Sequence, residues 1–156
     1  MYRTKIGHVL LNVYDLDQAI DFYTRFFGFR LVERVEDYRA FLSGSDAHHE
    51  IALEKVKPNT PHSPPDNAGV NHVAFEVPDK ESFARAFETL TKAGLHVTTS
   101  DNLISWSIYF EDPDSNLIEI YCDTRNEPDG QPLWRGIRKP LEPEKVLAAL
   151  EENDKD

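Results

Sequence analysis

The sequence predicts an α+β domain: two tandem βαβββ modules whose strands form a curved, cup-shaped mixed sheet with the helices on its outer face. The main observation is an internal repeat, because residues 6–13 read IGHVLLNV and residues 70–77 read VNHVAFEV, with a histidine third in each. Each copy is followed by an aspartate and then by an apolar-periodic stretch. A proline-rich segment, residues 57–69, separates the two copies. Self-similarity of this kind predicts a duplicated module.

The first module is expected over residues 5–56. It opens with a strand near 5–13, and Asp15 is the predicted N-cap of a helix at about 16–27 that ends at Gly28. Apolar residues within that helix recur at the spacing of one helical face. Three further strands are expected near 29–35, 38–43 and 49–54.

The second module, over residues 70–122, repeats this order. After a strand near 70–77, Asp79 is the predicted N-cap of a helix at about 80–93, which Gly94 closes. The remaining strands are expected near 95–99, 105–111 and 117–122.

One domain is therefore expected over residues 1–122, with the irregular segment 57–69 as the linker between its modules. The remaining residues, 123–156, contain four prolines and a short amphipathic helix near 144–151. We expect this C-terminal tail to pack on the domain, with a frayed end.

Composition narrows the class of protein. A chain of 156 residues with 40% apolar and 29% charged residues fits a globular domain. A net charge of −11 disfavours nucleic acids and anionic membranes as partners, since both require a basic surface. No apolar run approaches the roughly 18 residues of a membrane span, and the start has no signal-peptide pattern. With Cys122 as the one cysteine, we expect a cytoplasmic protein with a small-molecule ligand or a protein partner.

The alternation of side chains along a strand assigns the repeated histidines to one face. In both copies the all-apolar face is expected to pack beneath the helix, so His8 and His72 point to the mixed-polarity side. Glu119, between two isoleucines in the last strand, is expected on the corresponding side. Two neutral imidazoles and one carboxylate with open positions suit non-haem Fe(II), with Mn(II) or Zn(II) as alternatives.

Together these motifs resemble the vicinal oxygen chelate superfamily, which includes glyoxalases, bleomycin-resistance proteins and extradiol dioxygenases. The similar pieces are GHVLLNV, AIDFY and FGF, then NHVAFEV, then SIYFEDPDSNLIEIY, within about residues 5–122. The resemblance implies a metal triad of His8, His72 and Glu119. It is nearest to the single-domain type I extradiol ring-cleavage dioxygenases.

Two positions near the end of the first module help to distinguish glyoxalase-type from extradiol-type members of the superfamily. Glyoxalase I has a fourth ligand, a glutamate, where this chain has Ala52, although Glu50 and Glu54 share its face. The segment His48-His49-Glu50 resembles the one that supplies the acid–base histidine of extradiol enzymes, at His49. Simple alternation instead places His48 on the face of Ala52, unless the strand begins only at Glu50.

Three candidates in the second module complete the predicted site. Tyr109 and Glu119 are equidistant from the centre of the turn between their strands, so the hairpin sets them opposite each other. Extradiol enzymes also have a histidine in the loop before the tyrosine strand, where this chain has Asn102 or Ser100. Asn102 and Trp106 are candidates for substrate contact, with plain packing as the alternative for Trp106.

The resemblance implies Fe(II)-dependent cleavage of a catechol-type ring with O₂, as in the catabolism of aromatic compounds. His49 is expected to exchange protons with the diol, and Tyr109 to hydrogen-bond the substrate. The alternatives are a glyoxalase- or fosfomycin-resistance-type isomerase or thiol transferase, and a metal-free protein that binds an aromatic ligand. Similar proteins are commonly dimers, so a homodimer is an open expectation.

Overall fold

The computed structural model describes residues 4–62 and 68–151, so parts of the predicted linker and of the tail end lie outside it. The chain divides into two compact units, and each contains one copy of the repeat. The units are Met1–Gly69 with Asp112–Asn116, and Val70–Glu111 with Leu117–Asp156. No helix among the described residues has the length and apolar character that crossing a membrane requires.

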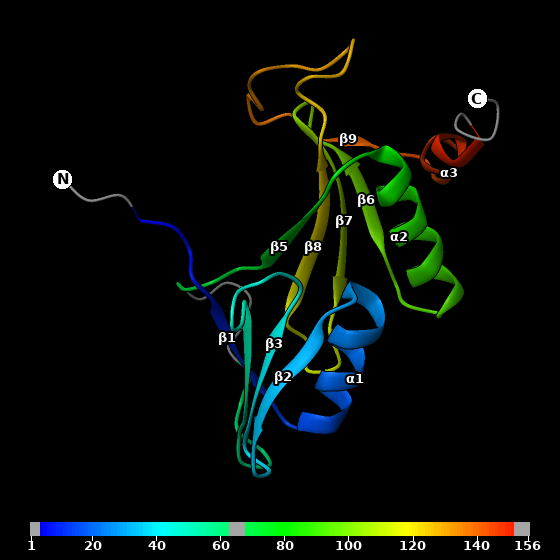
Figure 1. Ribbon diagram of the computed structural model, residues 1–156. Helices are drawn as coiled ribbons and strands as arrows, with labels where there is room; N and C mark the ends of the chain where they lie inside the picture. The colour runs from blue at the N-terminus through cyan, green and yellow to red at the C-terminus, as the bar shows by residue number, and fades with distance from the viewer. Residues whose placement is uncertain (1–3, 63–67, 152–156) are drawn as a thin grey trace. The chain divides into compact units, whose positions relative to one another are not determined.

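The described part of the first unit is a four-stranded mixed sheet with one helix against a face of it (Figure 1). The strand order is β1-β4-β3-β2, with β1 and β4 parallel and the other pairs antiparallel. Asp15 caps the helix by accepting a hydrogen bond from the backbone of Gln18, and Gly28 ends it at φ 65°. The elements are β1 (Val9–Val13), α1 (Leu16–Phe27), β2 (Arg30–Val35), β3 (Arg39–Ser43) and β4 (Ile51–Lys55).

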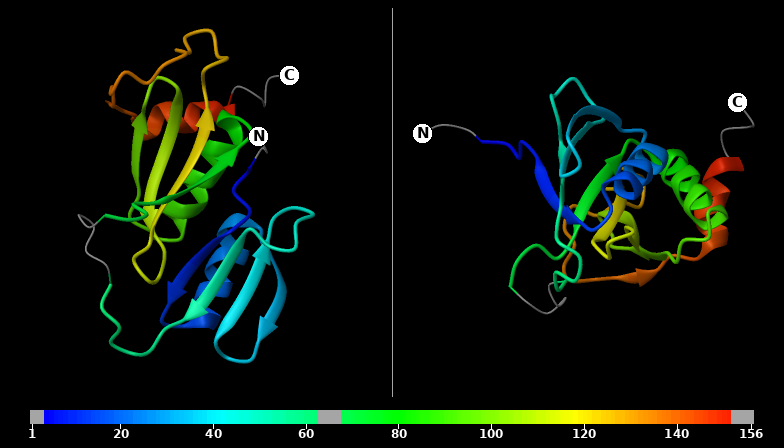
Figure 2. Two further views of the ribbon diagram at one scale, coloured as in Figure 1. Left: turned by 90° about the vertical axis from the view of Figure 1, so that its left-hand side faces the viewer. Right: turned by 90° about the horizontal axis from the view of Figure 1, so that it is seen from below.

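The second unit repeats this design and adds to it. Its strand order is β5-β8-β7-β6-β9 among the described residues, and α2 lies against one face of the sheet with α3 beside it (Figure 2). Asp79 caps α2 as predicted. The elements are β5 (Val73–Val77), α2 (Lys80–Lys92), β6 (Thr98–Asp101), β7 (Ser105–Glu111), β8 (Leu117–Asp123), β9 (Lys139–Pro140) and α3 (Pro143–Glu151). The predicted α+β class, with two βαβββ modules, is confirmed.

Three details of the strand predictions were wrong, the first being that the strand expected near 95–99 is β6, which spans Thr98–Asp101. Both repeated histidines directly precede their strands, because ladder pairing begins at Val9 with Ile51 and at Val73 with Ile118. The two-residue strand β9 was not expected, since so short a segment has no alternation of apolar and polar residues to reveal it.

The helix-facing side of each sheet forms the core of its unit. In the first unit Val13, Ala19 and Tyr23 are fully buried, and in the second Phe83, Ile108 and Ile118 are. These are the faces that alternation along the strands assigned to the helices. The opposite face of each sheet carries the repeated histidine and its polar neighbours.

Cys122 belongs to the core of the second unit, where it lies opposite Trp106. Burial raises the pKa of its thiol from the ordinary value of 9.0 to about 11. Because the thiolate is the reactive form, this shift lowers the reactive fraction at about pH 8 roughly 100-fold. We therefore expect iodoacetamide to alkylate the native protein at least ~100-fold more slowly than the urea-unfolded protein, measured by intact mass. Equal rates in the two states would contradict the burial of this strand.

Gly130 lies so close to neighbouring backbone atoms that there is no room for a side chain. A Cβ at this position would lie 2.1 Å from the carbonyl oxygen of Thr124 and 2.6 Å from that of Arg125. Replacing Gly130 by alanine forces backbone to move, so we expect a loss of about 1–3 kcal/mol in the free energy of unfolding. Chemical denaturation measures this loss, and Gly7→Ala is a control, since nothing lies within 4 Å of a Cβ added at Gly7. Full stability of the Gly130 variant would show that the segment 124–130 is not packed as described.

Candidate metal and substrate site

Two of the three predicted metal ligands meet in the second unit. The register of β5 with β8 places Ala74 opposite Glu119, and His72 lies two residues before Ala74 on the same face. The Nε2 atom of His72 is 2.9 Å from the Oε2 atom of Glu119. Glu119 is only 8% exposed, so this carboxylate has little access to solvent. A buried carboxylate requires a cation or a hydrogen-bond donor.

The hydrogen bond of the Nδ1 atom of His72 indicates how its Nε2 atom can interact with Glu119. Its Nδ1–H donates to the Oδ1 atom of Asn71 at 2.9 Å. The Nε2 atom, which faces the Glu119 carboxylate, is then the nitrogen that can bind a proton or a metal ion. An imidazole nitrogen and a carboxylate oxygen are both ligand types that divalent transition-metal ions accept. The pair therefore fits a divalent cation, and Asn71 fixes the tautomer that binding requires.

Tyr109 lies beside this pair. It is opposite Glu119 in the β7–β8 ladder, as predicted, and its ring meets the His72 ring edge-on with the centroids 5.8 Å apart. Burial and then the nearby Glu119 acceptor raise the pKa of the Tyr109 phenol, while Ser107 and Arg138 act in the opposite direction. The phenol is therefore protonated at neutral pH and available as a hydrogen-bond donor.

Asn102 and Trp106 differ in their relation to this face. Asn102 is buried, and its Nδ2 atom donates to the Ser107 hydroxyl at 2.9 Å, next to Tyr109 on the same face. Trp106 is 6% exposed and packs edge-on against Phe83 of α2. Alternation along β7 thus directs Trp106 away from Glu119, which favours the packing alternative for this residue. Asn102 supports the polar face through Ser107.

The first unit brings together its own pair of predicted residues. The rings of His8 and His49 lie 4.6 Å apart, and both approach the face on which Leu10, Ala52 and Phe41 are neighbours. Strand β4 begins at Ile51, so the alternation that would have favoured His48 does not extend back to the histidine pair. Burial lowers the pKa of His49, and the nearby His8 and His48 lower it further. His49 is therefore neutral at pH 7 and able to accept a proton.

His48 and the neighbouring glutamates have other partners. The Nε2 atom of His48 is 3.4 Å from a carboxylate oxygen of Glu33, and its Nδ1 atom lies 2.9 Å from Nδ1 of His49. Glu50 accepts hydrogen bonds from the Ser45 hydroxyl and the Gly44 backbone, and Glu54 pairs with Arg39. Neither glutamate therefore supplies a free carboxylate at the Ala52 position. Within residues 4–62 and 68–151, the structure gathers no group of three or more potential metal-ligating His, Cys, Asp or Glu side chains.

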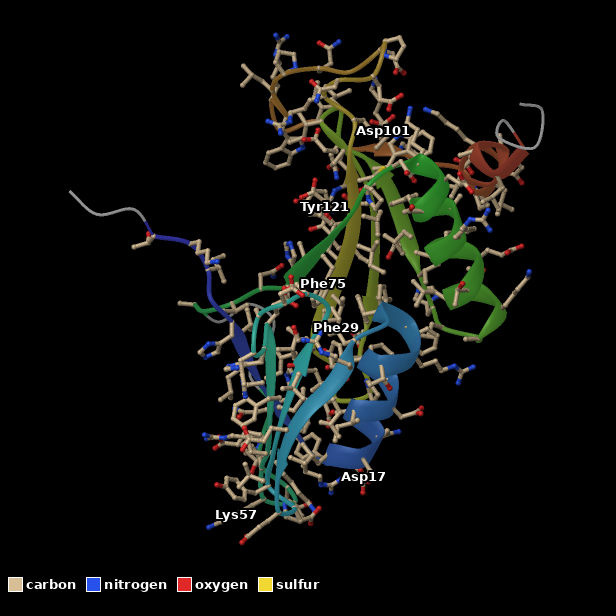
Figure 3. The ribbon with its side chains drawn as sticks, viewed as in Figure 1. Asp17, Phe29, Lys57, Phe75, Asp101 and Tyr121 are labelled. Atoms are coloured by element: carbon tan, nitrogen blue, oxygen red, sulfur yellow. The ribbon has the colours of Figure 1, made fainter. Side chains whose placement is uncertain are left out.

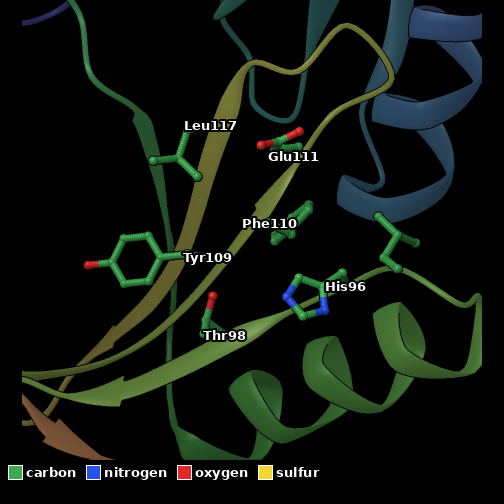
Figure 4. A pocket seen from close by; sticks show the side chains of 7 residues that line it. His96, Thr98, Tyr109, Phe110, Glu111 and Leu117 are labelled. Carbon is green, nitrogen blue, oxygen red and sulfur yellow. The ribbon is translucent and has the colours of Figure 1, made fainter. Parts of the chain in front are cut away.

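A cavity of about 300 Å³ adjoins Tyr109 in the second unit (Figure 4). Alternation places Thr98, Tyr109 and Leu117 of its lining on the same sheet face as Glu119. His96 also lines it, although in the sequence this histidine is too early for the loop before the tyrosine strand. The full lining is Leu95, His96, Thr98, Tyr109, Phe110, Glu111 and Leu117.

Sequence reasoning also missed Arg138, a residue of the tail. Its Cζ atom lies 5.2 Å from the centre of the Tyr109 ring, and its Nη2 atom is 3.5 Å from the Tyr109 hydroxyl. No local pattern signals this contact, because 29 residues separate the two side chains along the chain.

The comparison with known protein families agrees with the fold of the two repeated modules. The family model of the Glyoxalase/Bleomycin resistance protein/Dioxygenase superfamily matches residues 5–120. The chain belongs to this superfamily.

The curated relatives of this chain are named for different enzymatic activities. A catechol-2,3-dioxygenase of Bacillus subtilis is 29% identical over 77% of this chain, which spans 42% of that relative. A lactoylglutathione lyase of Pseudomonas putida is 25% identical over 76% of this chain and 84% of its own length. The chain spans 66% or less of the dioxygenase relatives named for catechol or biphenyl-2,3-diol.

Solved structures agree on the fold. A glyoxalase/bleomycin resistance protein/dioxygenase domain from Frankia sp. superimposes with a TM-score of 0.68 at 23% identity, covering 81% of this chain and 96% of that one. A fosfomycin resistance protein from Listeria monocytogenes gives a TM-score of 0.61 at 21% identity, covering 79% of this chain and 96% of that one. Members of the superfamily are mostly metal-dependent enzymes.

Proposed function

We propose that this protein is a metal-dependent extradiol dioxygenase that cleaves the ring of an aromatic diol with O₂. The observation that carries the proposal is the His72–Glu119 pair with Tyr109 beside it, on one sheet face of the second unit. The first unit adds a histidine pair, His8 and His49, on its own polar face. This set of groups includes metal ligands, a proton acceptor and a hydrogen-bond donor.

His8, His72 and Glu119 are the proposed ligands, and Fe(II) is the proposed metal, with Mn(II) as the alternative. Two imidazoles and one carboxylate hold such an ion and leave positions for exchangeable ligands. When bound, the ion supplies Lewis acidity toward the diol oxygens and the redox chemistry with O₂. Asn71 keeps His72 in the tautomer that offers Nε2 to the ion.

His49 and Tyr109 have separate proposed roles. His49, neutral at pH 7, accepts a proton from a diol hydroxyl and returns it later, which suits an imidazole. Tyr109 remains protonated, so it donates a hydrogen bond to a substrate oxygen and orients the ring. His48, paired with Glu33, is assigned no part in the reaction.

The environment of Ala52 supports a dioxygenase over a glyoxalase-type isomerase. A fourth carboxylate ligand is absent at Ala52 itself, and the carboxylates of Glu50 and Glu54 are bound by Gly44, Ser45 and Arg39. The relatives named as catechol and biphenyl-diol dioxygenases agree with this choice.

Oxygen uptake tests the proposal directly. The protein is loaded with Fe(II) without oxygen, mixed with one of several catechols, and then exposed to O₂. We expect oxygen consumption together with a yellow ring-opened product. If no catechol gives either signal, the proposal is wrong. Turnover of the hemithioacetal of glutathione and methylglyoxal, unaffected by His49→Ala, would instead assign the protein to the isomerase branch.

A further inference from the structure

The tail of the second unit contains a tight turn that comes directly before Arg138. The Ile137 backbone N–H donates to the Trp134 carbonyl at 3.1 Å, and the indole N–H of Trp134 donates to the Ile137 carbonyl at 2.7 Å. Arg135 and Gly136, the central residues, have φ values of 54° and 70°. Two left-handed central residues define a compact turn of the kind found in hairpins. The position of Arg138 is thus set by a closed turn.

Strand β9 continues from this turn and fixes the tail to the sheet. Lys139 pairs with Asp101 of β6, which Figure 3 labels, and the Thr99 hydroxyl donates to the Leu141 carbonyl at 2.6 Å. Leu141 and Val146 are buried farther along the tail. Arg138 is therefore held between a closed turn and a paired strand, so its backbone has little freedom.

The Arg138 guanidinium lies over the Tyr109 ring and near its hydroxyl. Among the described residues it has no carboxylate partner within salt-bridge distance, although the chain contains 28 acidic residues and only 17 lysines and arginines. Three of those cations, Arg135, Arg138 and Lys139, occur within five residues. Arg138 is exposed, and an exposed guanidinium without a carboxylate partner is available to bind an anion.

We propose that Arg138 determines substrate specificity by binding the carboxylate of an aromatic diol that carries an acidic substituent. The inference rests on the proposed function and names its substrate class. Tyr109 lies opposite Glu119 in the β7–β8 ladder, and its ring also contacts the Arg138 guanidinium. A ring bound against Tyr109 can thus direct its diol oxygens to the metal ligands and its carboxylate to the guanidinium. The planar fork of arginine suits a carboxylate through two parallel hydrogen bonds.

Anaerobic calorimetry compares the binding of 3,4-dihydroxybenzoate with that of unsubstituted catechol, using the full Fe(II)-loaded chain. We expect the wild type to prefer the carboxylate compound by about tenfold or more, as for a charge-assisted pair. Arg138→Gln is expected to weaken 3,4-dihydroxybenzoate binding about tenfold more than catechol binding and so to remove the preference, and Arg138→Lys to keep part of it. Arg135→Gln is the matched control, since it removes a charge from the same turn without touching Tyr109. Its preference is expected to equal that of the wild type.

Each contrary result has a separate meaning. An undiminished preference in Arg138→Gln, or no preference or binding in the wild type, overturns the role of Arg138 and leaves the ring-cleavage proposal standing on oxygen uptake. An equal loss of affinity for both compounds shows that Arg138 only positions Tyr109, which also overturns the inference. A preference that depends on Arg138, in a protein that consumes no oxygen with either compound, retains the carboxylate site and overturns the dioxygenase. Slow alkylation of Cys122 verifies that each variant is folded.

Discussion

Replacing Glu119 by glutamine is expected to weaken Fe(II) binding by more than about 100-fold. Loss of even a residue that only supports a ligand costs 10- to 100-fold in metal affinity, and Glu119 is the proposed anionic ligand itself. Glutamine has nearly the same shape but no charge to neutralise the ion. Anaerobic equilibrium dialysis followed by metal analysis gives the affinity. Retention of one tightly bound ion per chain in this variant would exclude Glu119 as a ligand.

The stability of the metal-free variant separates ligand loss from misfolding. In the native protein the Glu119 carboxylate is buried and faces Nε2 of His72. Glutamine removes that buried charge and can donate its own N–H to Nε2, so we expect no loss of thermal stability without metal. Glu88→Gln is the matched control, since Glu88 is a surface residue of α2 paired with Lys92 at 2.8 Å. It is expected to bind Fe(II) like the wild type.

Replacing His49 by glutamine is expected to lower the turnover number about 10²- to 10⁴-fold, the usual contribution of a general acid–base group. Fe(II) affinity should remain within a few-fold of the wild type, because His49 is not among the proposed ligands. Oxygen-uptake kinetics at saturating catechol measure turnover, and dialysis measures the metal. Since the His49 ring lies 4.6 Å from that of His8, both readouts are needed.

The adjacent residue provides the control for this prediction. His48→Gln changes the same chemical group one position earlier, where the imidazole contacts Glu33 and Nδ1 of His49. Glutamine retains a donor and an acceptor that can make the contact with His49. We expect its turnover to stay close to that of the wild type. A large loss in His48→Gln with normal turnover in His49→Gln would transfer the acid–base role to His48.

Much of the fold follows from local patterns in the chain. Asp15 and Asp79 precede amphipathic stretches, and each caps its helix as a side-chain acceptor. The placement of Tyr109 opposite Glu119 follows from the turn between them, because register in a hairpin is fixed by turn position. Such features depend on residues close together in the sequence, so they can be predicted without knowledge of the tertiary structure.

Other features depend on contacts between distant segments. The choice between His48 and His49 depends on where β4 begins, which its pairing with β1 and β3 decides. The hydrogen bond from the Ser45 hydroxyl to the Glu50 carboxylate likewise depends on the conformation of a loop. The alternation of side chains along a strand does not predict it. Strand patterns assign side chains to faces only where a ladder exists, and here the ladder ends at Ile51.

The sequence by itself determined the duplicated α+β architecture, the superfamily, and the position of Tyr109 opposite Glu119 in the last hairpin. Periodicity and capping carry that information in adjacent residues. Only the tertiary structure decided that Asn71 orients His72, that Trp106 belongs to the core, and that Arg138 reaches Tyr109. The last contact requires the tail to return to the edge of β6 and pair there. Long-range pairing of this kind leaves no periodic signal in the chain, which is why the proposed carboxylate recognition emerges only from the folded protein.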